Sequence, residues 1–221
     1  MRKKLKFDSK EYSEAVRYFN KNVQLLDQTI HDLCAEHPDH KDPASVHAKV
    51  WIIARTLSSG LERTIKSKGI GQGGALTLVR DEILKNGKRI DSLVADLKTI
   101  CEPLSVEKLQ KIVSIHGEIL RLLQSIARKP PRSFVSKYLH FHNSAVPIYD
   151  RMANRVLRDH GLLARAEETF QIPPRGDKAY ARHTMRFLKL YDIIREQNLK
   201  PTVKQVDSYL IRLAGNRSES R

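Results

Sequence analysis

Apolar residues recur at the spacing of an α-helix along most of the chain, and no segment shows the alternation that predicts a β-strand. The clearest apolar stripe consists of Val46, Val50, Ile53 and Leu57, and Pro43 stands in what would be the first helical turn. The same periodicity is found between residues 83 and 101, 105 and 126, 133 and 141, 151 and 160, 180 and 191, and after 202. The sequence therefore predicts an all-α protein.

Capping and breaking residues indicate where several of these helices begin and end. Ser105 can cap the helix that follows it, and Pro130 ends that helix. Asp150 stands at the N-cap position of the helix that begins at residue 151. Thr202 and Gln205 have the spacing of a capping box. The glycine-rich stretch from 69 to 74 interrupts the pattern and predicts a loop.

The charge balance limits the classes of partner. Forty Lys and Arg residues against 25 Asp and Glu residues give a formal net charge of +15. Such a surplus favours nucleic acid over a basic surface that only aids solubility. No apolar run approaches the roughly 20 residues of a membrane span, and no signal peptide is evident, so we expect a cytoplasmic protein without a membrane partner. Cys34 and Cys101 are too few for a four-cysteine metal centre, and we expect no cofactor.

Asp150 follows a long segment without acids. No Asp or Glu occurs between Glu118 and Asp150, whereas that interval contains Arg121, Arg128, Lys129, Arg132 and Lys137. A helix N-cap, which contributes about 1 kcal/mol, is enough to explain an aspartate at this position. An acid at a helix N-terminus among cations also stays ionised, and it can then stabilise a sugar cation or orient a water while a glycosidic bond breaks.

Lys137 has two interpretations. On an aqueous face Lys137 is a solvated charge or a phosphate contact, whereas a desolvated amine can attack a sugar carbon and form a Schiff base.

His140 and His142 point about 200° apart on a helix, so they cannot chelate one ion together. The sequence shows no further ligands for a zinc site there, and we expect no metal.

Two segments resemble helix-hairpin-helix DNA glycosylases. The order helix, Pro-rich turn, short helix and AVPIYDRMANRVL (145–157) is similar to the family's catalytic segment, in which the Asp of a V-P-x-D or V-D-T-H stretch caps the next helix. IIARTLSSGL (52–61) is similar to the family's I-A-x-x-L-S-x-Q-A segment, which ends at the loop that probes the minor groove. The similarity of order covers residues 43 to 160.

The chain also departs from the family pattern. VPIYD has one residue more than V-P-x-D, and ARKPPRSF (127–134) replaces the L-P-G-[VI]-G hairpin whose amides hold the DNA phosphate. The nucleophilic Lys of the strand-cleaving members falls at Arg132 or Ser133 when counted back from Asp150. The resemblance therefore carries over Asp150 alone and implies a monofunctional glycosylase without an iron–sulfur cluster, with Lys137 as a phosphate contact or alternative nucleophile.

The resemblance implies a bilobal architecture and a set of contact residues. Residues 43–144 would form one lobe and residues 1–42 with 145–221 the other, with a cleft for an extruded base of double-stranded DNA. We expect a monomer. Candidates for binding the base are Trp51, Tyr138, His140 and Tyr149. Candidates for the wedge and the DNA contacts are Ser58, Ser59, Gly60, Gln72, Arg128, Lys129, Arg132, Ser133 and Arg151, followed by Arg175, Lys178 and Arg182.

The substrate and two other functional classes stay open. A damaged base and a bulky modified cytosine of phage DNA, such as glucosylated hydroxymethylcytosine, are both hypotheses for the excised base. Arg155 and His160 fit the R-x4-H pattern of all-α HEPN-type ribonucleases. A DNA-binding module without catalytic activity is the third interpretation, and it predicts salt-sensitive binding with no base release.

Overall fold

The computed structural model describes residues 7–57, 59–66, 73–159 and 170–216, and within them the chain is all-α, as predicted. The only β pairing in these ranges is an isolated antiparallel bridge between Ile65 and Ala127. The helices are α1 (Ser9–Asn22), α2 (Gln24–Glu36), α3 (Pro43–Thr56), α4 (Leu61–Thr64), α5 (Gly74–Lys85), α6 (Gly87–Lys98), α7 (Val106–Leu122), α8 (Arg132–His142), α9 (Arg151–Asp159), α10 (Lys178–Arg195) and α11 (Val203–Asn216).

The capping residues seen in the sequence do cap these helices. The Ser105 hydroxyl accepts a hydrogen bond from Lys108 N at the start of α7. At the start of α11, Thr202 N donates to Gln205 Oε1 and Gln205 N donates to Thr202 Oγ1, which is a complete capping box. Local chemistry thus set these two boundaries.

The periodic stretch from residue 83 to 101 is interrupted, which the sequence pattern did not indicate. It contains the end of α5 and all of α6, with Asn86 between them. A Cβ on Gly87 would lie 2.5 Å from the His40 carbonyl oxygen, so only glycine permits this close approach at the start of α6. A tertiary contact with His40 therefore requires glycine at the first residue of α6.

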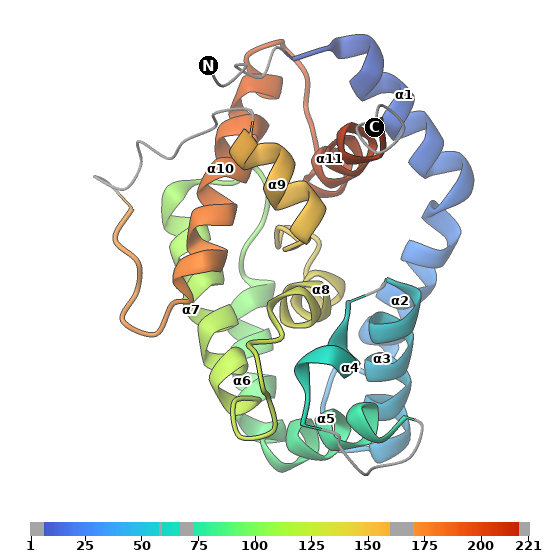
Figure 1. Cartoon of the computed structure of the whole chain (residues 1–221), viewed down its shortest axis with the longest axis vertical. Helices are drawn as coiled ribbons and strands as arrows, with labels where there is room; N and C mark the ends of the chain where they lie inside the picture. Colours follow the sequence, from blue (N-terminus) through green and yellow to red (C-terminus); the bar gives the residue numbers. More distant parts are fainter. Residues whose placement is uncertain (1–6, 58, 67–72, 160–169, 217–221) are drawn as a thin grey trace.

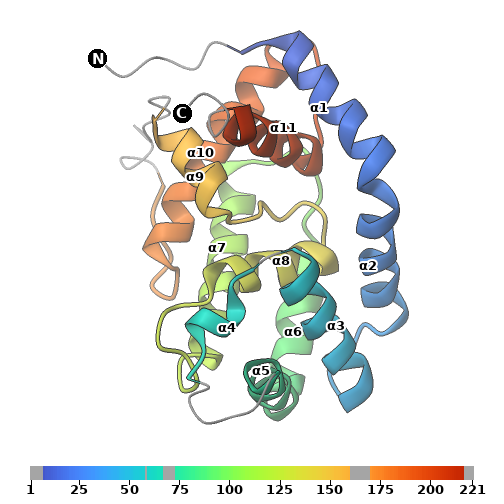
Figure 2. The same ribbon diagram turned by 45° about the vertical axis from the view of Figure 1, so that its right-hand side comes forward.

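Helix α8 lies at the centre of the molecule (Figure 1). All nine residues from Phe134 to His142 are buried, and α8 packs against α2, α3, α6 and α7. Figure 2 shows α8 between α3 and α6 on one side and the connection to α9 on the other. Both apolar and polar side chains of α8 are therefore removed from water.

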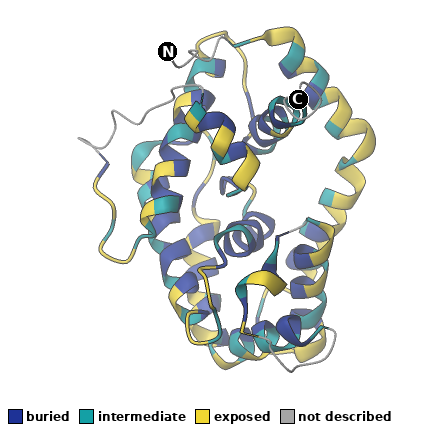
Figure 3. Ribbon diagram, viewed as in Figure 1, coloured by how far each residue is buried: buried dark blue, intermediate teal, exposed yellow. Residues whose placement is uncertain are grey.

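The remaining helices cover this centre from both ends. Helix α11 packs against α1 and α9, and α10 packs against α7 and α9. Exposed residues lie on the outward faces of the helices, most of all on α1 and α2, while the inward faces are buried (Figure 3). No helix in the described ranges is long and apolar enough to cross a membrane.

Candidate functional site

The chain after α8 folds back along that helix. His140 Nδ1 lies 2.9 Å from Val146 O, and Tyr149 N donates to Ser136 Oγ at 2.9 Å. The order of these pairs shows that the segment from 146 to 149 runs antiparallel to α8. The turn therefore returns Asp150 to the level of Lys137, thirteen residues earlier in the sequence.

Helix α10 holds the other side of the same segment. The Tyr180 hydroxyl donates to Pro147 O at 2.7 Å, and His183 Nε2 lies 2.8 Å from Ile148 O. Burial lowers the pKa of His183 to about 4, so its ring is neutral at pH 7 and Nε2 carries the proton that the carbonyl accepts. Side chains from α8 and α10 thus fix the backbone immediately before Asp150.

Asp150 is the N-cap of α9, as the sequence predicted. Its Oδ1 accepts hydrogen bonds from Met152 N at 2.7 Å and from Ala153 N at 3.2 Å. The carboxylate is half-buried, and its charge is stabilised by these two donors and by the positive end of the helix dipole. It is held rigidly and still has access to solvent.

Lys137 is buried in the middle of α8 and does not lie on an aqueous face. Its Nζ donates to Leu57 O, at the end of α3, at 2.6 Å. Burial lowers the pKa of Lys137, while the charges of Asp150 and Asp207 act in the opposite direction. The structure thus places Lys137 in the desolvated setting that the nucleophile interpretation requires, and a solvated phosphate contact does not fit its burial.

Asp207 on α11 is a member of this cluster that the sequence analysis missed. It is 7% exposed, and burial raises its pKa to about 6 against the opposing charges of Lys204 and Lys137. It also lines a hollow of about 430 Å³ between α1 and α11. In the sequence Asp207 follows the apolar Val206 in the last expected helix, and nothing there linked it to Asp150.

The cluster combines three ionisable groups in different settings. Asp150 is a hydrogen-bonded carboxylate, Asp207 is a buried acid that titrates near pH 6, and Lys137 is a desolvated amine. Neighbouring groups whose environments push their pKa values apart are suited to dividing the roles of acid, base and nucleophile. This arrangement can stabilise a cation, accept a proton from water, or present an amine.

The four residues predicted to bind a base are separated by the fold. Tyr138 is enclosed in the core, where its hydroxyl lies 2.8 Å from His40 Nε2, and His140 is also fully buried. Trp51 is 48% exposed on α3, with the Arg55 guanidinium 5.9 Å from its ring centroid. Tyr149 is half-buried beside Asp150 and the His183 ring, so among the four it is the one placed next to the candidate carboxylate.

Two of the predicted DNA-contact segments lie side by side. Arg128 N donates to Thr64 O at 2.7 Å, and Lys66 N donates to Ile126 O at 2.8 Å, around the Ile65 to Ala127 bridge. Gly60, with φ of 66°, precedes α4 in a left-handed conformation that favours glycine. The short helix α4 therefore connects the Gly60 turn to the basic segment.

The basic segment borders a second hollow, of about 310 Å³. Its lining includes Arg121, Arg128 and Lys129, which are all exposed. Arg132 is less available, because its Nε donates to Asp177 Oδ1 at 2.7 Å. Arg121, Arg128 and Lys129 therefore carry exposed positive charge along this hollow.

The other predicted contacts are scattered. Ser59 is buried and donates to Ala54 O, Ser133 is half-buried in the first turn of α8, and Arg151 is exposed at the start of α9. Ser58 and Gln72 lie outside the described residues.

The later arginines and lysines also have individual settings. Arg175 is paired with Glu118 at 3.3 Å, and Lys178 and Arg182 are exposed on α10. Of the ribonuclease pair, Arg155 faces Asp159 at 3.6 Å, and His160 lies outside the described residues.

Comparisons of the chain with family models, curated proteins and solved structures give no significant match. The chemistry open to this chain is therefore inferred from the geometry of the cluster around Lys137 and Asp150.

Proposed function

We propose that this chain is a monofunctional DNA glycosylase that excises a damaged or modified base. The proposal depends on one observation above all, the return of Asp150 to the buried Lys137 by the fold-back along α8. The resemblance of residues 145–157 to the catalytic segment of helix-hairpin-helix glycosylases supports the same assignment.

In this proposal Asp150 acts on the sugar of an extruded nucleotide. As the bond between C1′ and the base nitrogen breaks, its electron pair leaves with the base and C1′ becomes cationic. The Asp150 carboxylate stabilises that cation and accepts a proton from the water whose oxygen bonds to C1′. That proton balances the one that the departing base takes up, and an abasic site remains.

The residues around Asp150 have supporting roles in the proposal. Ser136, Tyr180 and His183 are positioning residues, because they hold the backbone of residues 147–149 and do not themselves reach the substrate. Tyr149 is proposed to contact the extruded base. Lys137 raises the local positive charge and is the alternative nucleophile.

The proposed DNA path follows the exposed charge. Arg121, Arg128 and Lys129 would contact phosphates, and the Gly60 turn, joined to them by the Ile65 to Ala127 bridge, would approach the duplex. We propose that residues 43–144 form one lobe, residues 1–42 and 145–221 the other, and that the base enters between α8 and α9.

Base release tests the proposal. Wild type and Asp150→Asn are incubated with T-even-type phage DNA, duplexes carrying damaged bases, and unmodified DNA, and abasic sites are detected by alkali cleavage. We expect release from one modified substrate and a loss of about 10²- to 10⁴-fold in Asp150→Asn. Because asparagine caps a helix about as well as aspartate, the variant removes the charge while α9 keeps its cap.

Asp42→Asn is the matched control. Asp42 caps α3 through Ala44 N and Ser45 N, as Asp150 caps α9, but it lies outside the Lys137 cluster. We expect Asp42→Asn to release base at the wild-type rate. Equal losses in both variants would indicate that a helix cap, and not catalysis, explains Asp150.

Borohydride trapping separates the two roles of Lys137. A monofunctional enzyme forms no covalent complex with DNA, whereas trapping that is lost in Lys137→Gln would assign the lysine as a nucleophile. Cleavage of RNA that is lost in Arg155→Ala, with DNA left intact, would favour the ribonuclease. Salt-sensitive DNA binding without release from any substrate would favour the binding module.

A further inference from the structure

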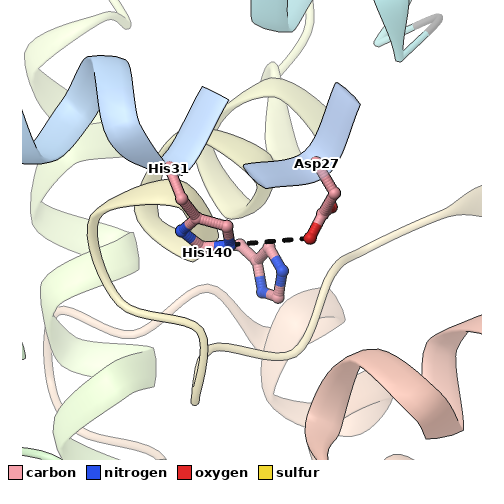
Figure 4. A group of neighbouring side chains, drawn as sticks. All are labelled: Asp27, His31 and His140. Atoms are coloured by element: carbon pink, nitrogen blue, oxygen red, sulfur yellow. Dashed lines mark ion pairs between the residues drawn. The ribbon is translucent and has the colours of Figure 1, made fainter. Parts of the chain in front are cut away.

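Three potential metal ligands converge where α2 meets α8. Asp27 and His31 are one turn apart on α2, and His140 faces them from α8 (Figure 4). One ligand atom from each residue can be chosen so that all three atoms lie within 4.8 Å of one another. His31 Nε2 is 3.8 Å from Asp27 Oδ2. The three side chains thus form a compact set of two imidazoles and one carboxylate.

The His140 ring is oriented as a metal ligand would be. Its Nδ1 is held by Val146 O at 2.9 Å, which assigns the proton to that nitrogen. Its Nε2 is fully buried and has no hydrogen-bond partner among the described residues, although an unsatisfied buried lone pair is costly. A backbone carbonyl on one ring nitrogen and a free lone pair on the other is the arrangement found around metal-binding histidines.

His31 and Asp27 are held in complementary ways. The His31 ring packs against the Phe141 ring, with the two centroids 4.9 Å apart. Asp27 Oδ1 forms an ion pair with Lys204 Nζ at 2.7 Å, while Oδ2 is directed toward His31. Lys204 therefore orients the carboxylate through the oxygen that is not needed for coordination. Its positive charge lowers the affinity for a cation, and the Asp27 carboxylate offsets that charge.

We propose that Asp27, His31 and His140 bind a divalent transition-metal ion of the zinc class, with a fourth position left for water. Zinc bonds of about 2.0 to 2.2 Å place tetrahedral ligands roughly 3.3 Å apart, so the three atoms must approach by up to about 1.5 Å. Asp27 and His31 have side chains that are 12% and 23% exposed, which gives the ion a path of entry. Rotation of the Asp27 and His31 side chains brings the ligand atoms to that distance.

The plain alternative is an ion pair within one helix. A His and Asp pair at this spacing occurs without a metal and stabilises a helix only weakly. That interpretation does not explain why the buried Nε2 of His140, from a different helix, faces the pair without a partner. The metal site explains all three side chains, and it does not depend on the proposed glycosylase activity.

Cobalt substitution tests the site without any activity measurement. The full chain without a histidine tag is titrated with Co²⁺, and the visible d–d absorption is followed. We expect one Co²⁺ per chain, with the visible bands of a four-coordinate site. These bands should disappear when Zn²⁺ is added. Asp27→Asn and His31→Ala should each weaken binding by at least about tenfold.

His37→Ala is the matched control, because His37 is an exposed histidine at the end of the same helix. It should bind Co²⁺ as the wild type does. Asp27 and His31 are both partly exposed, so their variants should fold, and circular dichroism without metal checks that they do. Absence of the visible bands in the wild type, or equal binding by wild type and His31→Ala, would overturn the proposal.

Discussion

At the scale of the residue, Asp207 is a buried carboxylic acid whose ionisation the fold opposes. It is buried on α11, and its Oδ1 has no hydrogen-bond partner in the described part of the chain. Its pKa is raised from 3.8 to about 6, so folding favours the protonated acid. The stabilisation from the protonated form is fully present below pH 3.8 and is lost as the pH rises through 6.

Asp207→Asn should therefore stabilise the protein at neutral pH. Because the shift is about two pKa units, we expect the free energy of unfolding of the variant to exceed that of the wild type by about 1 to 3 kcal/mol at pH 7.5. This difference should disappear near pH 4. Urea unfolding of both proteins at the two pH values measures this. A variant less stable than the wild type at pH 7.5 would show that attraction to Lys137 and Lys204 outweighs the cost of burial.

At the scale of the element, α7 and the turn before α10 touch at Gly117. A Cβ there would lie 1.9 Å from Arg175 O and 3.0 Å from Gly176 Cα, and both are backbone atoms. Arg121 Nη1 also donates to Arg175 O at 2.8 Å. The turn is therefore seated directly on the helix, and it precedes the α10 residues that hold the segment from 147 to 149.

Gly117→Ala should destabilise the protein, because the turn must move away from α7. We expect a loss of about 2 kcal/mol or more in the free energy of unfolding, together with weaker base release if α10 shifts. Gly215→Ala, in the last turn of α11 with no atom within 4 Å of the added Cβ, is the control and should be neutral or stabilising by up to about 1 kcal/mol. Thermal melts of both variants give the comparison, and equal melting temperatures would contradict the expectation.

The helices and the candidate residues differed in how far the sequence could predict them. Ser105, Asp150 and the Thr202 capping box act through neighbours within three residues, so their helix ends were predictable. The close approach of Gly87 to the backbone depends on His40, and the raised pKa of Asp207 depends first on its burial by the surrounding helices. Such long-range causes leave no local pattern. For the same reason the sequence could not show that Tyr138, a candidate for binding the base, lies in the core.

At the scale of the whole molecule, the net charge of +15 predicts salt-sensitive binding to DNA. If the exposed residues around the 310 Å³ hollow contact phosphates, the double variant Arg128→Glu with Lys129→Glu should bind DNA with a weaker salt dependence. We expect the negative slope of log affinity against log salt to become shallower by about 2. Fluorescence anisotropy with a short duplex at several salt concentrations measures the slope.

Lys10→Glu with Lys21→Glu is the control for this measurement. Both lysines are exposed on α1, and the double variant changes the net charge by the same amount. We expect its slope to stay close to that of the wild type. Equal losses in the two double variants would indicate binding by diffuse charge, without a defined contact region.

The pairing of α1 with α11 has a consequence for synthesis on the ribosome. Tyr12 donates to Gln205 Oε1, 193 residues later in the chain, and its ring packs edge-on against Tyr209. During translation α1 therefore emerges long before its partner, and its apolar face stays uncovered until α11 has been made. A nascent chain stalled before residue 203 would expose that face to chaperones and proteases, so incomplete copies would be removed selectively.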